Sequence, residues 1–145
     1  MNRRIKRITA AILTLCLCIV PFHYVSAANE IMPLYNNVGY ADTTVSISDT
    51  GLMTITYRYS GDPMVMTKAV ITTYIEKQTL GVFWSRIDIG KPDNEWVDTI
   101  AQYSYHYSRT FQLPSTGTYR VTVTYKISGL GGDPDIITHV IKKSY

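Results

Sequence analysis

Cysteine is scarce in this sequence, and its position excludes several kinds of chemistry. The chain has 145 residues and two cysteines, Cys16 and Cys18, both within the first 20 residues. The rest of the chain therefore has no thiol nucleophile, no cysteine ligand for zinc and no disulfide. A domain formed by that part of the chain has to be stabilised by its apolar core alone.

Long apolar runs are also missing beyond residue 20. The run Ile8–Val20 has thirteen residues, which is too short to span a bilayer as a helix. It is followed by Val25-Ser26-Ala27, which has small residues where a signal peptidase needs them, and it is preceded by four basic residues, Arg3, Arg4, Lys6 and Arg7. This order predicts a secretory signal peptide over residues 1–27, cleaved between Ala27 and Ala28. The product would be secreted, extracellular or associated with the cell wall, with no transmembrane segment.

A lipid anchor is the competing interpretation of the two cysteines. It requires a small residue just before the cysteine, and Leu15 and Leu17 occupy those positions. We therefore expect Cys16 and Cys18 to be ordinary apolar residues of the signal peptide.

Positive charge is in excess only until the predicted signal peptide is removed. The chain has 14 basic and 11 acidic residues, a formal charge of +3. Four of the basic residues precede residue 8 and all acidic residues follow residue 28, so ten basic residues oppose eleven acidic ones in the mature chain. Its charge of −1 predicts no nucleic-acid partner.

Alternation of apolar and polar residues dominates the rest of the chain and predicts strands. The clearest example is Tyr119–Ile127, where every second residue is apolar. We expect seven to nine short strands in a single domain over residues 28–145, folded as an antiparallel sandwich. The predicted strands lie near residues 44–48, 53–59, 68–77, 82–89, 96–100, 103–113, 118–127 and 135–143. Arg109 interrupts the aromatic row of its strand, which indicates a β-bulge or a strand that overhangs the core.

One segment resembles a known structural motif. Leu113–Val121, with the sequence Leu-Pro-Ser-Thr-Gly-Thr-Tyr-Arg-Val, is similar to the E-to-F corner of immunoglobulin-like domains. The resemblance implies an all-β, immunoglobulin-like sandwich of about seven strands, with Tyr119 as the structural corner tyrosine. Val121 stands where antibody domains have a cysteine, so the likeness is to disulfide-free relatives of the fibronectin III or PKD kind.

The layout of the whole chain is similar to that of short secreted proteins of Firmicutes. The shared marks are the signal peptide, the segment Glu30–Asn37 and the Gly117–Val121 corner near the end. The resemblance implies an extracellular bacterial protein. It brings no established activity, so no catalytic residue is carried over.

Catalytic and metal-binding patterns are sparse. His106 and His139 lie within predicted strands, and no serine occupies a Gly-x-Ser-x-Gly elbow. We therefore expect no enzyme activity and no cofactor, with a small hydrolase as the last alternative. Acidic residues gather near two loops, at Asp93, Glu95 and Asp98 and at Asp133 and Asp135. They could hold calcium, but turn chemistry explains them as well, and we predict no metal site.

Aromatic residues are abundant and suggest recognition. Eleven tyrosines, two tryptophans and two phenylalanines follow residue 27. Next to Tyr57, Tyr119 and Tyr125, the residues two positions away, which lie on the same face of the strand, include aliphatic ones. These three tyrosines are therefore expected in the core. We hypothesise a contact surface beside the Gly90–Glu95 loop, formed by Trp84, Trp96, Tyr103, Tyr105 and Tyr107. The competing interpretation is that these aromatics only pack within the sheet.

The expected function is a secreted, non-enzymatic binding module for an extracellular protein or glycan. Carbohydrate binding through exposed aromatics is one alternative, and a secreted antibacterial or toxin-like protein is another.

Overall fold

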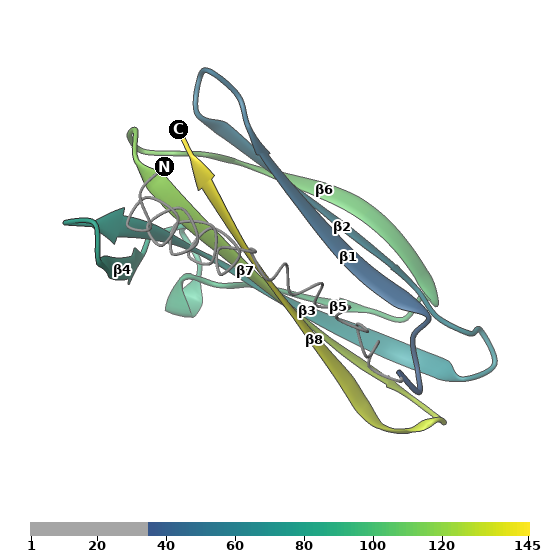
Figure 1. Ribbon diagram of the computed structural model, residues 1–145. Coiled ribbons are helices and arrows are strands. Elements are labelled where there is room, and N and C mark those ends of the chain that lie inside the picture. The colour runs from purple at the N-terminus through teal and green to yellow at the C-terminus, as the bar shows by residue number, and fades with distance from the viewer. Residues whose placement is uncertain (1–34) are drawn as a thin grey trace, which may run out of the picture. The chain divides into compact units, whose positions relative to one another are not determined.

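Eight antiparallel strands form almost all of the regular structure in residues 35–145, the part of the chain that this computed structural model describes (Figure 1). The predicted signal peptide and its cleavage site at Ala27 and Ala28 lie outside the described residues. The strands are β1 (Tyr40–Ile47), β2 (Leu52–Ser60), β3 (Met66–Thr79), β4 (Phe83–Arg86), β5 (Trp96–Ile100), β6 (Ser104–Gln112), β7 (Thr118–Gly129) and β8 (Gly132–Ser144). A single 3-10 turn, η1 (Pro92–Asn94), precedes β5.

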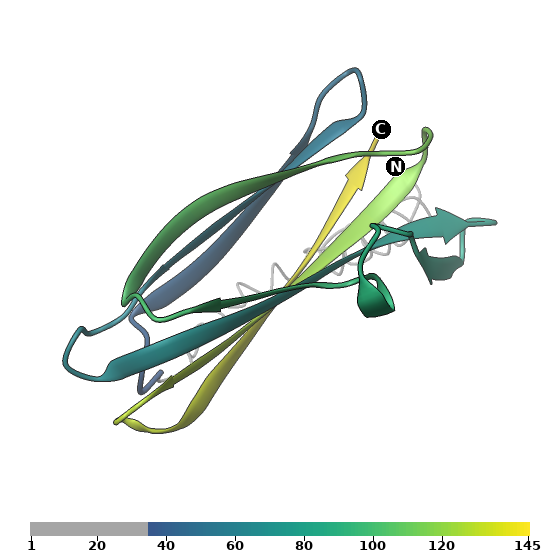
Figure 2. The ribbon, with the colours of Figure 1, turned by 180° about the vertical axis from the view of Figure 1, so that it is seen from behind.

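The strands pair into two sheets, which Figures 1 and 2 show as two layers. Sheet A has three strands in the order β1-β2-β6. Sheet B has five strands, with β4-β3-β7-β8 in order and β5 also paired to β3. Strands β4 and β5 pair with opposite ends of the long strand β3, at Glu76–Thr79 and Ala69–Thr73. The all-β, antiparallel prediction is therefore confirmed for the described residues.

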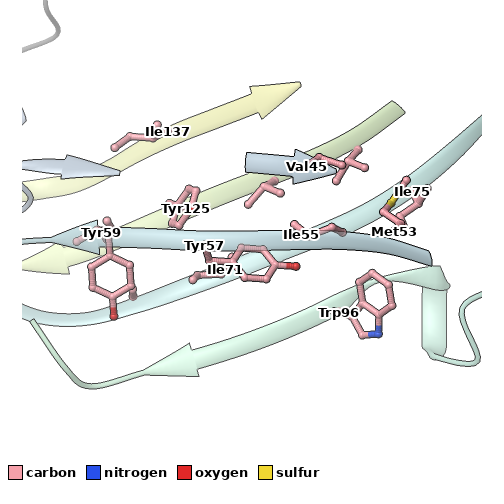
Figure 3. Close-up of a cluster of buried hydrophobic side chains, with 14 of the residues drawn as sticks. Val45, Met53, Ile55, Tyr57, Tyr59, Ile71, Ile75, Trp96, Tyr125 and Ile137 are labelled. Atoms are coloured by element: carbon pink, nitrogen blue, oxygen red, sulfur yellow. The ribbon is translucent and has the colours of Figure 1, made fainter. Parts of the chain in front are cut away.

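Period-two alternation places one face of each sheet in the core. In β7, Tyr119, Val121, Val123, Tyr125 and Ile127 are all buried. They meet side chains of sheet A such as Met53, Ile55 and Tyr57 (Figure 3). The prediction that Tyr57, Tyr119 and Tyr125 lie in the core is confirmed. At roughly 1.5–3 kcal/mol for each large apolar side chain, this burial is the main source of stability in a domain without disulfides.

Two features differ from the sequence expectations. Strands β2 and β6 stay in register from Leu52 opposite Gln112 to Ser60 opposite Ser104, so of the two alternatives for Arg109 the β-bulge is wrong. The register shifts instead at the end of the molecule where β3 begins and β7 ends, between Met66 and Lys68 and between Ile127 and Gly129. Strand β4 is also shorter than predicted, because its pairing with β3 ends at Arg86 and the residues that follow form the loop before η1.

The segment between β6 and β7 is held by Tyr119. Its ring is fully buried, and its hydroxyl donates a hydrogen bond to the carbonyl oxygen of Ser115, four residues upstream, at 2.5 Å. Gly117 lies within this segment and has a φ of 149°, a value that glycine adopts without strain. The hydrogen bond therefore fixes the path by which the chain crosses from sheet A to sheet B.

A buried carboxylate ties the segment before β1 to the β7–β8 hairpin. Asp135 accepts hydrogen bonds from the backbone N–H groups of Asn36, Asn37 and Val38, at 3.1, 2.7 and 3.2 Å. A Cβ added to Gly131 would lie 2.3 Å from the carbonyl oxygen of Asn36, so only glycine allows this close approach. The contact joins two segments that lie almost a hundred residues apart in the sequence.

Candidate functional site: a side groove along β5

A groove of about 540 Å³ runs along β5 and the loop before it. We call it the side groove; its lining residues are Lys91, Pro92, Asp93, Glu95, Trp96, Val97, Asp98 and Arg109. Strand β5 pairs only with β3, and β6 pairs only with β2, so each is an edge strand of its sheet. The groove therefore lies where the edges of the two sheets come together.

Arg109 of β6 is the central charged residue of the side groove. Its Nη2 atom lies 2.9 and 2.8 Å from the two carboxylate oxygens of Asp98 in β5, which links the edges of the two sheets. Its guanidinium also lies over the rings of Trp96, at 4.9 Å, and Tyr107, at 5.9 Å. Stacking and ion pairing together hold the guanidinium in a fixed orientation beside the groove.

A row of stacked tyrosines extends the side groove toward the start of β6. Tyr107 stacks on Tyr57 and Tyr105 stacks on Tyr59, with ring centroids 6.5 and 5.7 Å apart. Tyr107 is 45% exposed, so a ligand could reach its ring, whereas Tyr57 and Tyr59 are buried beneath the row. Burial is also the main cause that raises the pKa of Tyr105 above its ordinary value.

Polar atoms without a partner lie behind this row. The hydroxyl of Tyr57, the hydroxyl of Thr73 and Nε of Arg109 are buried and have no hydrogen-bond partner among the described residues. Figure 3 shows the Tyr57 ring between the strands, with its hydroxyl directed toward the side where Trp96 lies. Burial raises the pKa of Tyr57 to about 12, although the nearby Thr73 hydroxyl acts in the opposite direction. The inner wall of the site is therefore more polar than a sandwich core usually is.

The five aromatic residues of the predicted contact surface do not share one surface. Tyr105 and Tyr107 lie in the row beside the side groove, and Tyr103, 52% exposed, lies in the connection just before β6. Trp84 lies on β4 at the far end of β3, on the outward face of sheet B. There its ring is covered by the guanidinium of Arg120 at 4.4 Å.

The expected exposure of Trp96 is wrong. Its side chain is only 7% exposed and packs edge-on against Phe111, with centroids 5.8 Å apart. Strand β5 turns this residue toward the core because its register sets Trp96 opposite the fully buried Thr73 of β3. Trp96 therefore forms a wall of the groove by supporting Arg109, and presents little of its own surface.

Sequence reasoning missed the pair formed by Arg109 and Asp98. The sequence did contain a signal for this pair. Arg109 is the one cation in a row of aromatic residues, and Asp98 lies two positions after Trp96, on the same face of the preceding strand. Such a charge on an inward-facing position requires a partner of opposite charge. Only the pairing of both strands with their own sheets shows that these two residues face each other.

Most acidic residues weighed for calcium have other partners. Glu95 pairs with Arg86 at 2.8 Å, Asp98 pairs with Arg109, and Asp135 accepts backbone N–H groups. Within residues 35–145, no three acidic, histidine or cysteine side chains are grouped as a metal site requires. His106 is exposed on the outward face of sheet A, and His139 packs edge-on against Tyr125.

No described protein family matches the chain, and no curated protein is detectably similar to it in sequence. Among the described residues, no helix has the length and apolar character needed to cross a membrane.

Proposed function

We propose that this protein is a secreted, non-enzymatic binding module with an immunoglobulin-like sandwich, and that its ligand occupies the side groove. The strand order of the two sheets and the hydrogen bond from Tyr119 to Ser115 support the immunoglobulin-like assignment. The amino-terminal pattern of basic, apolar and small residues supports secretion into an extracellular or cell-wall setting.

The observation that carries the binding proposal is the pre-organised Arg109 guanidinium at the groove. Its ion pair with Asp98 and its stacking on Trp96 set its position before any ligand arrives. A binding site whose charged group is already fixed loses little conformational entropy when it binds. Stability alone does not call for such a group, because an apolar residue would fill the same space without being desolvated as a charge.

The chemistry of the groove favours an extended polypeptide as the ligand. Because β5 has a strand on one side only, the backbone groups along its other side are able to pair with an added strand. Side chains of that strand would then alternate between the groove and solvent. Lys91 would pair with an acidic side chain and Asp93 with a basic one, and Arg109 would donate hydrogen bonds to oxygen atoms of the ligand. Tyr107, beside the groove, would pack against apolar or aromatic side chains.

The test is selection of a random peptide library on the full-length protein, followed by affinity measurements with three variants. Val97→Asp changes the lining of the groove, and Tyr107→Ala changes the aromatic row beside it. Tyr40→Ala is the matched control, because Tyr40 is also about half exposed but lies on β1. We expect selected peptides to bind about tenfold more weakly to Tyr107→Ala, as a lost aromatic contact would cause, and equally well to Tyr40→Ala.

Two outcomes would contradict the proposal. Peptides that lose as much affinity with Tyr40→Ala as with Tyr107→Ala would place the ligand elsewhere. A glycan array in which neutral sugars bind the wild type but not Tyr107→Ala would assign the groove to carbohydrate instead.

A further inference from the structure

The outward face of sheet B carries half of the positive charge of the described chain. Residues 35–145 contain ten basic and ten acidic residues. Strand register places five of the basic residues on this one face, with Glu76 as the single acidic residue projecting from the same strands. We call this surface the cationic face; its basic residues are Lys68, Arg86, Arg120, Lys126 and Lys142. Because basic and acidic residues are equal in number over residues 35–145, the net charge of this part gives no sign of this concentration of positive charge.

Three of these cations lie in one row across the sheet. Arg86 of β4 is opposite Glu76 of β3, Glu76 is opposite Arg120 of β7, and Arg120 is opposite Lys142 of β8. Adjacent strands lie about 4.8 Å apart, so the row spans roughly 14 Å. A linear polymer that crosses the strands would meet Lys142, which has no carboxylate partner among the described residues, together with Arg120 and Arg86, which pair with Glu76 and Glu95.

Aromatic rings hold these cations in place. The guanidinium of Arg86 lies 4.1 Å from the ring centroid of Tyr74, and that of Arg120 lies 4.4 Å from Trp84. The ammonium of Lys142 lies 5.5 Å from the same Trp84 ring. Cation–π contacts of this kind reduce the freedom of long side chains that would otherwise be mobile on a sheet surface.

Arg120 keeps donors available for a ligand. Its Nε atom donates to Glu76 at 2.6 Å, while no described residue accepts a hydrogen bond from its two terminal nitrogens. A planar guanidinium with free terminal nitrogens matches the two oxygens of a carboxylate. Four positions away along β3, Thr72 stands opposite Thr124 and Thr124 opposite Thr138. This row of hydroxyl groups lies on the same face, roughly 13 Å from the charged row.

We propose that the cationic face binds an acidic polysaccharide, in which ionised carboxylates meet the row of cations and sugar hydroxyls meet the threonine row. The described residues contain no α-helix that could enter the major groove of a nucleic acid. The ring of Trp84 is covered by cations and does not offer the open stacking platform that single-stranded nucleic acids use. This inference does not depend on the side groove.

Binding to immobilised polygalacturonate tests the proposal, using the full-length chain and surface plasmon resonance. Lys142→Gln and the double variant Arg120→Gln, Lys142→Gln remove charge from the row. Arg58→Gln is the matched control, because Arg58 is exposed on the outward face of sheet A. The comparison between variants also corrects for binding by the basic amino-terminal residues, which all of them share.

We expect Lys142→Gln to weaken binding about threefold and the double variant about tenfold, as exposed charge pairs do, with no change for Arg58→Gln. Added salt should weaken the wild-type complex, and neutral dextran should not bind. Lys142 is exposed on an edge strand, so this variant should melt at the wild-type temperature and report on binding alone.

Three results would overturn the proposal. The first is no binding of polygalacturonate at low salt. The second is equal loss of affinity with Arg58→Gln, which would mean unspecific ion exchange. The third is tighter binding of DNA, polyphosphate or anionic lipid vesicles than of polygalacturonate, which would assign the face to that other partner. Tyr107→Ala should leave polysaccharide affinity unchanged, so failure at the groove and failure at the cationic face can be told apart.

Discussion

The hydroxyl groups of the buried tyrosines lie in different surroundings. Tyr125 donates a hydrogen bond to the carbonyl oxygen of Asp42 at 2.7 Å and therefore accepts one from the hydroxyl of Thr43. Tyr59 donates to the carbonyl oxygen of Gln102 at 2.9 Å, whereas Tyr57 has no partner among the described residues. Burial raises the pKa of all three from 10.0 to about 12. Each of these tyrosines therefore holds its proton more tightly in the folded state than in the unfolded chain.

Alkaline pH should destabilise the fold through these residues. Between pH 10 and 12 the unfolded chain loses tyrosine protons that the folded state retains, so the free energy of unfolding falls as pH rises. Each tyrosine should contribute about 1 kcal/mol of this loss by pH 11. Tyr57→Phe removes one such group and a buried hydroxyl without a partner. The variant should lose less stability than the wild type between pH 8 and 11 in urea titrations; parallel loss in both proteins would contradict the argument.

Strand β5 is the element most dependent on one side chain. It has five residues and pairs only with β3, so its position rests on Trp96, which packs against Phe111 and beneath Arg109. Strand β4 is also short, with four residues, but Trp84 lies on the outward face of its sheet. On two similar edge strands, Trp96 therefore packs in the core, whereas Trp84 lies on the surface beneath cations.

Replacing each tryptophan by alanine should therefore lower the free energy of unfolding by different amounts. Trp96→Ala should lower the free energy of unfolding by about 3–5 kcal/mol, because it leaves a cavity between the sheets. Trp84→Ala should cost only about 1 kcal/mol, the scale of an exposed cation–π contact. Urea denaturation followed by circular dichroism measures both values, and similar losses for the two variants would contradict the burial of Trp96.

At the scale of the molecule, alternation predicted the antiparallel, all-β architecture, because the face on which a strand residue lies depends on local geometry. The core positions of Tyr57, Tyr119 and Tyr125 follow from that alternation alone. The candidate site could not be predicted from this alternation. The burial of Trp96 depends on which strand pairs with β5, and the cation row requires the register of four strands at once. The position of a residue in the alternation shows on which face of the strand it lies. Its neighbours on adjacent strands become known only when the strand pairing is known.

The tie through Asp135 acts on the whole molecule, because it joins the segment leading into sheet A to a strand of sheet B. Asp135→Asn removes a charge that accepts three backbone N–H groups and should cost about 2–3 kcal/mol of stability. Asp133→Asn, on an exposed residue of the same hairpin, is the control and should have little effect. Thermal melts of both variants provide the measurement, and an unchanged melting temperature for Asp135→Asn would show that the tie is dispensable.

Arg86 of the cationic face contacts two residues that line the side groove, so it connects the two proposed surfaces. Its guanidinium lies over Tyr74 on the cationic face, pairs with Glu95 and donates to the carbonyl oxygen of Asp93, and both acidic residues line the side groove. A groove ligand that draws Glu95 away would release Arg86 to the anion on the other surface. Thermodynamic linkage then requires reciprocity. If the groove ligand changes the affinity for the polysaccharide by some factor, the polysaccharide changes the affinity for the groove ligand by the same factor. A single arginine would thus make the two proposed binding events interdependent.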